Sequence, residues 1–402
     1  MQRSERPREP LKRIGPSHPE AVRIRLGRDG ADLKEDRFLG GRLLIESSRG
    51  VHGPERMVIG ALSPDFGGDV LVVGGRGGVV SLAAARIAPQ ARVEQFHLDA
   101  YDHRRALAAA AANGLGNFRA MLGADLERPG RFDWVFLPVK RSSDAMLTGE
   151  WIRQAYRSLK PRGKLLAGTE NPNDRWLHDQ ILEVFGAATI HVRNKHGRVY
   201  IARRQDAREP RERDYRRRFA ARLFGREIDV ETRPGVFSHG DLDGGTLALA
   251  EVASATIEGK TGVRVADLGC GSGALGIAAA LASPGGRAVL VDSSARSVQV
   301  ARANIARNGA ANSALAVLGT DLASLRVGSF DAVLANPPYF SDFRIAELFI
   351  RESLRVLAPG GELFLVAKAA ERPLEIANVV FGNAEIAARR GYTVIRARRG
   401  SS

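Results

Sequence analysis

Short apolar segments alternate with helix-like stretches along this chain, and the pattern predicts parallel β-sheets covered by helices. In the first half, the segments of strand length are 69–73, 91–98, 132–137 and 164–167, the last of them after a turn at 161–163. The stretches 79–87 and 104–113 are typical of helices. Strands that alternate with helices indicate an α/β fold, with a mostly parallel sheet wound on both faces.

The second half of the chain repeats the order of the first. The matched pairs of segments are 69–73 with 264–268, 104–114 with 298–309, 130–133 with 328–331, and 159–165 with 357–363. Four shared landmarks in the same order and with similar spacing indicate a duplication. The sequence therefore predicts two tandem domains of one fold.

These landmarks divide the chain into four parts. We expect a basic, partly flexible tail at 1–40, a first domain at 41–204, an Arg-rich connector at 205–226 and a second domain at 227–402. Aspartates and glutamates are interspersed among the arginines of the connector. Part of it therefore also fits a solvated helix face whose charges pair with one another.

Composition narrows the class of protein. A length of 402 residues with 44% hydrophobic content suits two soluble domains, and no apolar run is long enough to cross a membrane. The charged N-terminus lacks the apolar core of a secretory signal. The single cysteine, Cys270, excludes an internal disulfide and suits a reducing compartment, so we expect a cytoplasmic protein. We also expect a monomer. The eight histidines have no metal-ligand spacing, which predicts no metal site.

The net charge of +15 favours nucleic acid as a partner. The alternative explanation is a composition bias, because the chain uses Arg far more than Lys. The positive residues are concentrated in 203–226, however, and a local concentration points to a binding surface.

The stretch Asn336-Pro337-Pro338-Tyr339 carries the strongest chemical signal. It follows the buried strand predicted at 330–335, and its two prolines fix two φ angles and remove two N–H donors. An amide and an outward carbonyl at a strand end, with a ring beside them, can hold a planar amino group. The alternative is a rigid turn, but the first copy has Pro138-Val139-Lys140 at this corner, so the fold does not require the motif.

The glycine-rich turn at 269–273 predicts a ligand site at the next strand end. Glycines after a buried strand let the backbone approach a ligand, and the following helix offers its N-terminus. The turn fits a dinucleotide pattern, with Asp292 near the position of a ribose-binding acid. Asp267, inside the strand, and the tetrapeptide argue against a nicotinamide cofactor. The first copy has Val72, Arg76 and His97 at the matching positions, with Asp99 nearby, so we infer that it kept the fold and lost the site.

Together these residues carry a family resemblance. Asp267 to Gly273, then Asp292, then Asn336 to Tyr339 resemble the signature of class I S-adenosylmethionine-dependent methyltransferases that act on planar amino nitrogens. Residues 235–246 are similar to a segment of the bacterial ribosomal RNA guanine-N2 methyltransferases, both those of the small and those of the large ribosomal subunit. That family also carries a degenerate domain before an active one. The resemblance implies two tandem Rossmann-like methyltransferase domains, S-adenosylmethionine as cofactor, and ribosomal RNA or a ribosomal subunit as partner.

The resemblance also implies roles for single residues in cofactor binding. Gly269, Gly271 and Gly273 would pack against the methionine part of the cofactor, Asp267 would take its ammonium group, and Asp292 would accept from the ribose hydroxyls. Asp321 would contact the adenine, or it is the N-cap of a following helix, and we weigh these two interpretations equally. Phe237 would cover the cofactor or the base.

For catalysis, Asn336 and the carbonyl of Pro337 would accept hydrogen bonds from the guanine amine. Pro338 would keep that corner rigid, and Tyr339 would stack on the extruded base. Rival functions are methylation of adenine N6 or of a protein glutamine amide, which use the same tetrapeptide, and non-catalytic RNA binding. A nicotinamide-dependent dehydrogenase is a more distant alternative.

Overall fold

The computed structural model describes residues 23–26, 31–38, 41–46, 51, 53–75, 77–126, 128–206, 208–320, 323, 325–338 and 343–401. Three strands lie near the N-terminus: β1 (Arg23–Leu26), β2 (Ala31–Phe38) and β3 (Gly41–Glu46) form an antiparallel sheet in that order. Two of these strands fall within the predicted tail. A tail was expected because residues 1–40 contain no apolar run. Strands can nevertheless form here, because they pair through backbone hydrogen bonds.

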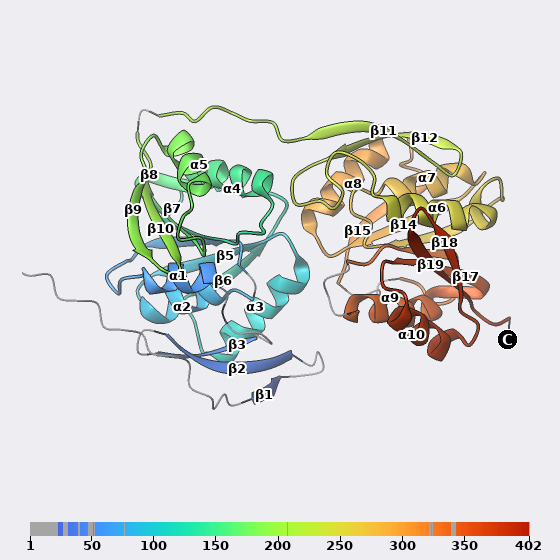
Figure 1. Cartoon of the computed structure of the whole chain (residues 1–402), viewed down its shortest axis with the longest axis horizontal. Coiled ribbons are helices and arrows are strands. Elements are labelled where there is room, and N and C mark those ends of the chain that lie inside the picture. The colour runs from blue at the N-terminus through green and yellow to red at the C-terminus, as the bar shows by residue number, and fades with distance from the viewer. Residues whose placement is uncertain are drawn as a thin grey trace, which may run out of the picture.

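The first large sheet has seven strands in the order β6-β5-β4-β7-β8-β10-β9, with only β10 antiparallel to its neighbours (Figure 1). Its strands are β4 (Asp69–Val73), β5 (Arg92–His97), β6 (Phe118–Leu122), β7 (Phe132–Val139), β8 (Leu159–Thr169), β9 (Thr189–Asn194) and β10 (Gly197–Arg203). Helices α1 (Gly53–Gly60), α2 (Val79–Ile87) and α3 (Ala100–Ala112) contribute to the core on one face. Helices α4 (Ala145–Ser158) and α5 (Trp176–Phe185) contribute to the core on the other.

The second large sheet has the same strand order, β15-β14-β13-β16-β17-β19-β18. Its strands are β13 (Arg264–Leu268), β14 (Arg287–Asp292), β15 (Ala314–Leu318), β16 (Phe330–Ala335), β17 (Leu357–Ala367), β18 (Glu385–Arg389) and β19 (Tyr392–Arg398). Helices α6 (Gly244–Ile257), α7 (Ala274–Ala282) and α8 (Ala295–Arg307) share one core, and α9 (Arg344–Val356) and α10 (Glu371–Phe381) share the other. The matching order confirms the predicted fold class, two tandem Rossmann-like domains wound on both faces.

The connector between the sheets contains a β-hairpin. Strands β11 (Arg217–Leu223) and β12 (Arg226–Thr232) pair antiparallel and lie along the second domain (Figure 1). The interpretation as a helix face is therefore wrong. Phe219, Ala221 and Leu223 alternate with exposed residues and pack on the second domain's core, so the apolar period here is two and not 3.6.

The strands predicted from buried apolar runs in the two large sheets are present, whereas two of the predicted helices begin too late. The helix expected at 104–113 begins at Ala100, because Asp99 caps it by accepting from two backbone N–H groups. The matching stretch of the second half, at 298–309, belongs to a helix that begins at Ala295, because the Ser294 hydroxyl caps it by accepting from the backbone N–H of Ser297. The turn expected at 161–163 lies inside β8, where Arg162 has a positive φ of 64° and the register with β7 shifts.

Equivalent loops of the two domains pair with each other. Asp99 and Ser294 form an antiparallel bridge, the Ala100 N–H donates to the Ser293 carbonyl (2.8 Å), and the Ala295 N–H donates to the Leu98 carbonyl (2.7 Å). In the first copy this loop follows β5, and in the second it follows β14. The residues directly after Asp292 are therefore fixed against the first domain.

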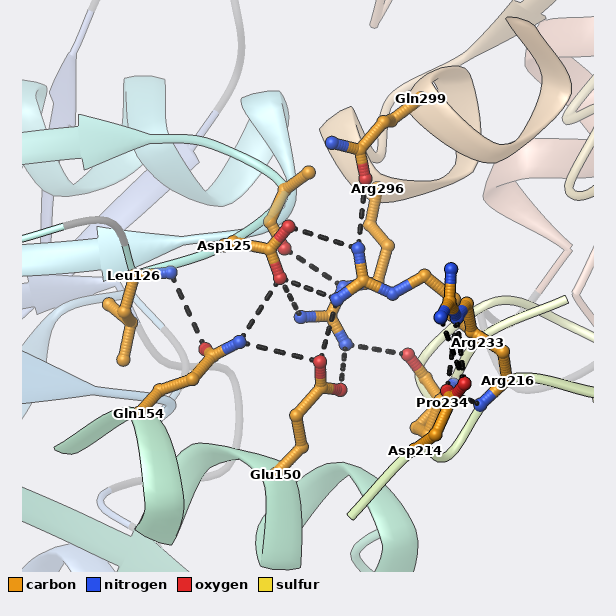
Figure 2. Close-up of polar contacts among 11 residues, drawn as sticks. Asp125, Leu126, Glu150, Gln154, Asp214, Arg216, Arg233, Pro234, Arg296 and Gln299 are labelled. Carbon is orange, nitrogen blue, oxygen red and sulfur yellow. Dashed lines mark hydrogen bonds and ion pairs between the residues drawn. The ribbon is translucent and has the colours of Figure 1, made fainter. Parts of the chain in front are cut away.

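An ion-pair network around the buried Arg296 continues this interface. Arg233 and Arg296 point between Asp125, after β6, and Glu150 on α4 (Figure 2). The Arg296 side chain is 0% exposed and also donates to the backbone carbonyls of Ala124 (2.9 Å) and Pro234 (2.8 Å). Burial alone would raise the pKa of Asp125, but the hydrogen bonds and charges of the two arginines outweigh it and lower that pKa.

Candidate active site

Three of the predicted site residues meet at one edge of the second sheet. Strands β14, β13 and β16 are parallel neighbours, so their carboxyl ends lie side by side. Asp267 lies near the end of β13, Asp292 ends β14, and Asn336 directly follows β16. In a sheet of this kind, this edge is where ligands bind.

The glycine turn between β13 and α7 needs its glycines for different reasons. Gly269, Gly271 and Gly273 all have positive φ values, 70°, 55° and 80°. A Cβ added at Gly273 would lie 2.8 Å from Leu290, so this glycine lets the turn pack against β14. A Cβ at Gly271 would meet only Phe237, at 4.0 Å. Gly271 is buried but leaves room for a Cβ, and its neighbour Phe237 is 59% exposed.

Asp267 is buried beneath this turn. Its Oδ2 accepts a hydrogen bond from the backbone N–H of Gly276, in the first turn of α7, at 2.9 Å. Burial raises the pKa of Asp267 to about 7, and the charge of Asp292 adds to this, while the hydrogen bond from Gly276 opposes it. The carboxyl group thus sits at the positive end of a helix, and burial still keeps its pKa close to neutral pH.

Asp292 braces the glycine turn from the neighbouring strand. Its two oxygens accept from the backbone N–H groups of Gly271 (2.9 Å) and Ser294 (2.8 Å). Burial raises the pKa of Asp292 to about 6, although these hydrogen bonds lower it. Two carboxyl groups with raised pKa values at one strand edge favour a ligand that carries positive charge.

Asn336 is held by residues that its sequence motif does not contain. Its Nδ2 donates to Asp243 Oδ2 (3.0 Å) and to Thr246 Oγ1 (3.1 Å), at the start of α6. Pro337 is buried and Pro338 is partly buried. Sequence reasoning missed the roles of Asp243 and Thr246, although an Asp directly before an apolar helical run is a signal for an N-cap.

The structure describes some of the other residues discussed for the site and not others. Asp321, Tyr339 and Arg76 lie outside the described residues. Phe343, which directly precedes α9, is 38% exposed and has a φ of 63°. Burial raises the pKa of the Cys270 thiol well above its ordinary value, which suits a packing role in the turn. Within the described ranges, no group of His, Cys, Asp and Glu is arranged to hold a metal ion, and no helix is long and apolar enough to span a membrane.

The first domain keeps a cavity at the matching edge but has different chemistry there. The cavity of about 340 Å³ is lined by Gly74, Gly75, His97, Pro138 and Trp151, among others. Burial lowers the pKa of His97 to about 4, so a neutral ring stands where the second domain has Asp292. Pro138 stands where the second domain has Asn336 and supplies no side-chain acceptor. The first copy therefore lacks the carboxylate and the amide of the second site.

Known proteins match this chain, some over the second domain and some over both domains. The Methyltransferase small domain family matches residues 227–396. Ribosomal RNA large subunit methyltransferase G of Ectopseudomonas mendocina is 31% identical over 295 residues, which is 71% of this chain and 76% of that protein. Ribosomal RNA small subunit methyltransferase C of Chromohalobacter salexigens is 40% identical over 35% of this chain and 42% of that protein. The corresponding protein of Pseudomonas entomophila is 35% identical over 46% and 54%.

A solved structure covers both domains. The T. thermophilus 16S rRNA N2 methyltransferase RsmC, in complex with AdoMet and guanosine, superposes with a TM-score of 0.75 and 25% sequence identity. The match covers 91% of this chain and 98% of that one.

The tandem fold and the acidic strand edge with its glycine turn define a class I methyltransferase. The chain belongs to the family of ribosomal RNA methyltransferases that includes these relatives, methyltransferase C and methyltransferase G. It spans about half the length of the two methyltransferase C relatives named here.

Proposed function

We propose that this protein transfers a methyl group from S-adenosylmethionine to the N2 amine of a guanine in ribosomal RNA. The observation that carries the proposal is Asn336, whose amide is held at the carboxyl end of β16, on the strand edge that also carries Asp267 and Asp292. The methyltransferase G relative and the N2 methyltransferase RsmC support the choice of acceptor.

The residues of the second domain fit this cofactor. S-adenosylmethionine supplies an electrophilic methyl group and carries an ammonium group, a sulfonium and a ribose diol. Asp267 would hold the ammonium and Asp292 the ribose hydroxyls, because a carboxyl group whose pKa is raised by burial gains most from a cationic or donating ligand. Gly269, Gly271 and Gly273 would line the methionine part, and Phe237, beside Gly271, would cover the cofactor.

The guanine amine that receives the methyl group is a weak nucleophile, so the protein has to orient it. The lone pair of the guanine N2 atom is delocalised into the ring. Asn336 Oδ1 and the Pro337 carbonyl would accept hydrogen bonds from its two N–H groups, turn the lone pair toward the methyl group, and stabilise the positive charge that develops on nitrogen. No strong general base is needed, because the alkylated nitrogen loses its proton readily. Tyr339 would stack on the extruded base, with Pro338 keeping the corner rigid.

The remaining parts of the chain would hold the RNA. We assign 227–402 to catalysis, 41–204 to a degenerate domain that docks the RNA, and 205–226 to a basic connector that follows phosphates. The net charge of +15 supports this, because affinity for RNA depends strongly on neutralised phosphates. The protein would act as a cytoplasmic monomer on ribosomal RNA or a ribosomal particle.

The decisive test is methyl transfer to defined RNA. Purified protein, labelled S-adenosylmethionine and RNA of each ribosomal subunit, naked or assembled, should yield N2-methylguanosine on mass-spectrometric analysis of the digested RNA. Asn336→Ala should abolish transfer while the Kd for the cofactor stays nearly unchanged. Asn312→Ala, an exposed amide in the same domain, serves as the matched control. Methylation of adenine, or full activity of Asn336→Ala, would refute the proposal.

A further inference from the structure

We propose that Asp243, together with Thr246, is a positioning residue that fixes which end of the Asn336 amide faces the substrate. This inference rests on the proposed function, because it concerns the residue that would accept from the substrate amine. It assigns a catalytic purpose to the start of α6, which contributes no atom to the motif at 336–339.

The geometry divides the two oxygens of Asp243 between two tasks. Oδ1 caps α6 by accepting from the backbone N–H groups of Gly245 (2.6 Å) and Thr246 (3.2 Å). Oδ2 accepts from the Thr246 hydroxyl (2.8 Å) and from Asn336 Nδ2 (3.0 Å). A helix cap needs only the first set of bonds. The second oxygen is therefore what connects the cap to the site.

These contacts select one orientation of the amide. The two ends of an Asn side chain have nearly the same shape but opposite hydrogen-bonding character. A carboxylate can only accept, and the Thr246 hydroxyl has already given its proton to Asp243, so it too accepts from Asn336 Nδ2 (3.1 Å). Both neighbours demand the amino end. A flipped amide would place its oxygen against two acceptors.

The selected orientation is the one that the reaction needs. With Nδ2 turned to α6, Oδ1 lies on the opposite branch of the planar group, turned away from Asp243. An oxygen there can accept from an amine, whereas a flipped amide would present N–H donors to the donors of the substrate. Asp243 thus decides whether Asn336 attracts the substrate amine or repels it.

The start of α6 is itself held in place. A Cβ added at Gly244 would lie 2.8 Å from the Tyr392 ring on β19, so this glycine lets the helix begin directly against the sheet. The Asp-Gly-Gly-Thr sequence at 243–246 therefore combines a cap, a close approach and a hydroxyl. Each of these fixes the position of the Asp243 carboxyl group relative to Asn336.

The test is Asp243→Asn in the full chain. Asn caps helices about as well as Asp, so the fold should persist, but its amide can also donate to Asn336 and allow the flip. We expect kcat to fall roughly 10- to 100-fold, by analogy with the loss of residues that orient a functional side chain at other sites. The KM for RNA, the Kd for S-adenosylmethionine and the Tm should stay nearly unchanged. Asp179→Asn, at an exposed acid in the first turn of α5, is the control for the loss of charge and should keep the wild-type kcat.

A second pair of variants covers the case in which Asp243→Asn does not fold. Thr246→Val removes the hydroxyl at constant shape and should lower kcat, whereas Thr246→Ser retains it and should not. Wild-type kcat in Asp243→Asn or in Thr246→Val would overturn this inference, as would a loss confined to cofactor affinity. If the wild-type protein forms no N2-methylguanosine, the proposed function fails instead, so the two failures are distinguishable.

Discussion

Replacing Asp267 by Asn should make the protein more stable and at the same time less able to bind its cofactor. Asp267 is only 3% exposed, and its one described hydrogen bond comes from the Gly276 N–H. An Asn side chain has nearly the same shape, and its oxygen can still accept that bond. The substitution therefore removes a buried charge and keeps the contact with α7.

The magnitude follows from the pKa of Asp267. Burial raises this pKa from 3.8 to about 7. A pKa change of one unit corresponds to about 1.4 kcal/mol, so ionised Asp267 destabilises the folded state by roughly 4 kcal/mol. The new amino group has to find its own acceptor, which offsets part of the gain by about 1–3 kcal/mol. We expect a net stabilisation of about 1–3 kcal/mol at pH values above 7.

The effect has a defined pH dependence. The folded state holds the proton of Asp267 more tightly than the unfolded chain does, so the cost of ionisation is absent below the unfolded pKa. It grows between pH of about 4 and about 7, and it is complete above the folded pKa. The gain in stability from Asp267→Asn should therefore appear at about pH 8. Near about pH 4 the cost of the unpaired amino group alone remains, so the variant should be less stable than the wild type by about 1–3 kcal/mol.

Urea denaturation of the cofactor-free protein at both pH values measures this difference, and calorimetric titration measures cofactor affinity. Asp331→Asn is the control with the opposite sign. Burial would raise the pKa of Asp331, but hydrogen bonds and charge from Arg264 outweigh it and lower that pKa, so its loss should destabilise the protein above pH of about 4. A loss of stability in Asp267→Asn at about pH 8, or unchanged cofactor affinity, would show that the reasoning is wrong.

Two further predictions concern the carboxyl groups and the domain interface. A cationic cofactor should lower the pKa of Asp267 and Asp292, so its binding near about pH 6–7 should release protons. The measured binding enthalpy should then depend on the ionisation enthalpy of the buffer. Equal binding enthalpies in all buffers would contradict this. Arg296→Met should reduce the free energy of unfolding by about 1–3 kcal/mol, because the carbonyls of Ala124 and Pro234 lose this donor and the acidic groups keep only Arg233. Gln299→Ala, at the edge of the network, should cost far less in the same denaturation experiment.

The positions where sequence and structure differ are informative. The strands expected at 69–73, 264–268 and 330–335 coincide with β4, β13 and β16, because a buried parallel strand is a continuous apolar run. The hairpin at β11 and β12 was misjudged, because charged residues dominate its composition and only the alternation of Phe219, Ala221 and Leu223 reveals a strand.

The sequence by itself determined the duplication, the parallel sheets and the strand ends that carry Asp267, Asp292 and Asn336. These depend on local runs and on a repeat within the chain, which the order of residues records directly. The tertiary structure decided what holds these groups. Asp243 reaches Asn336 across 93 positions, and the loop after Asp292 pairs with the equivalent loop of the first domain. Such contacts, and the raised pKa values that come from burial, arise only when distant segments are brought together and water is excluded around them.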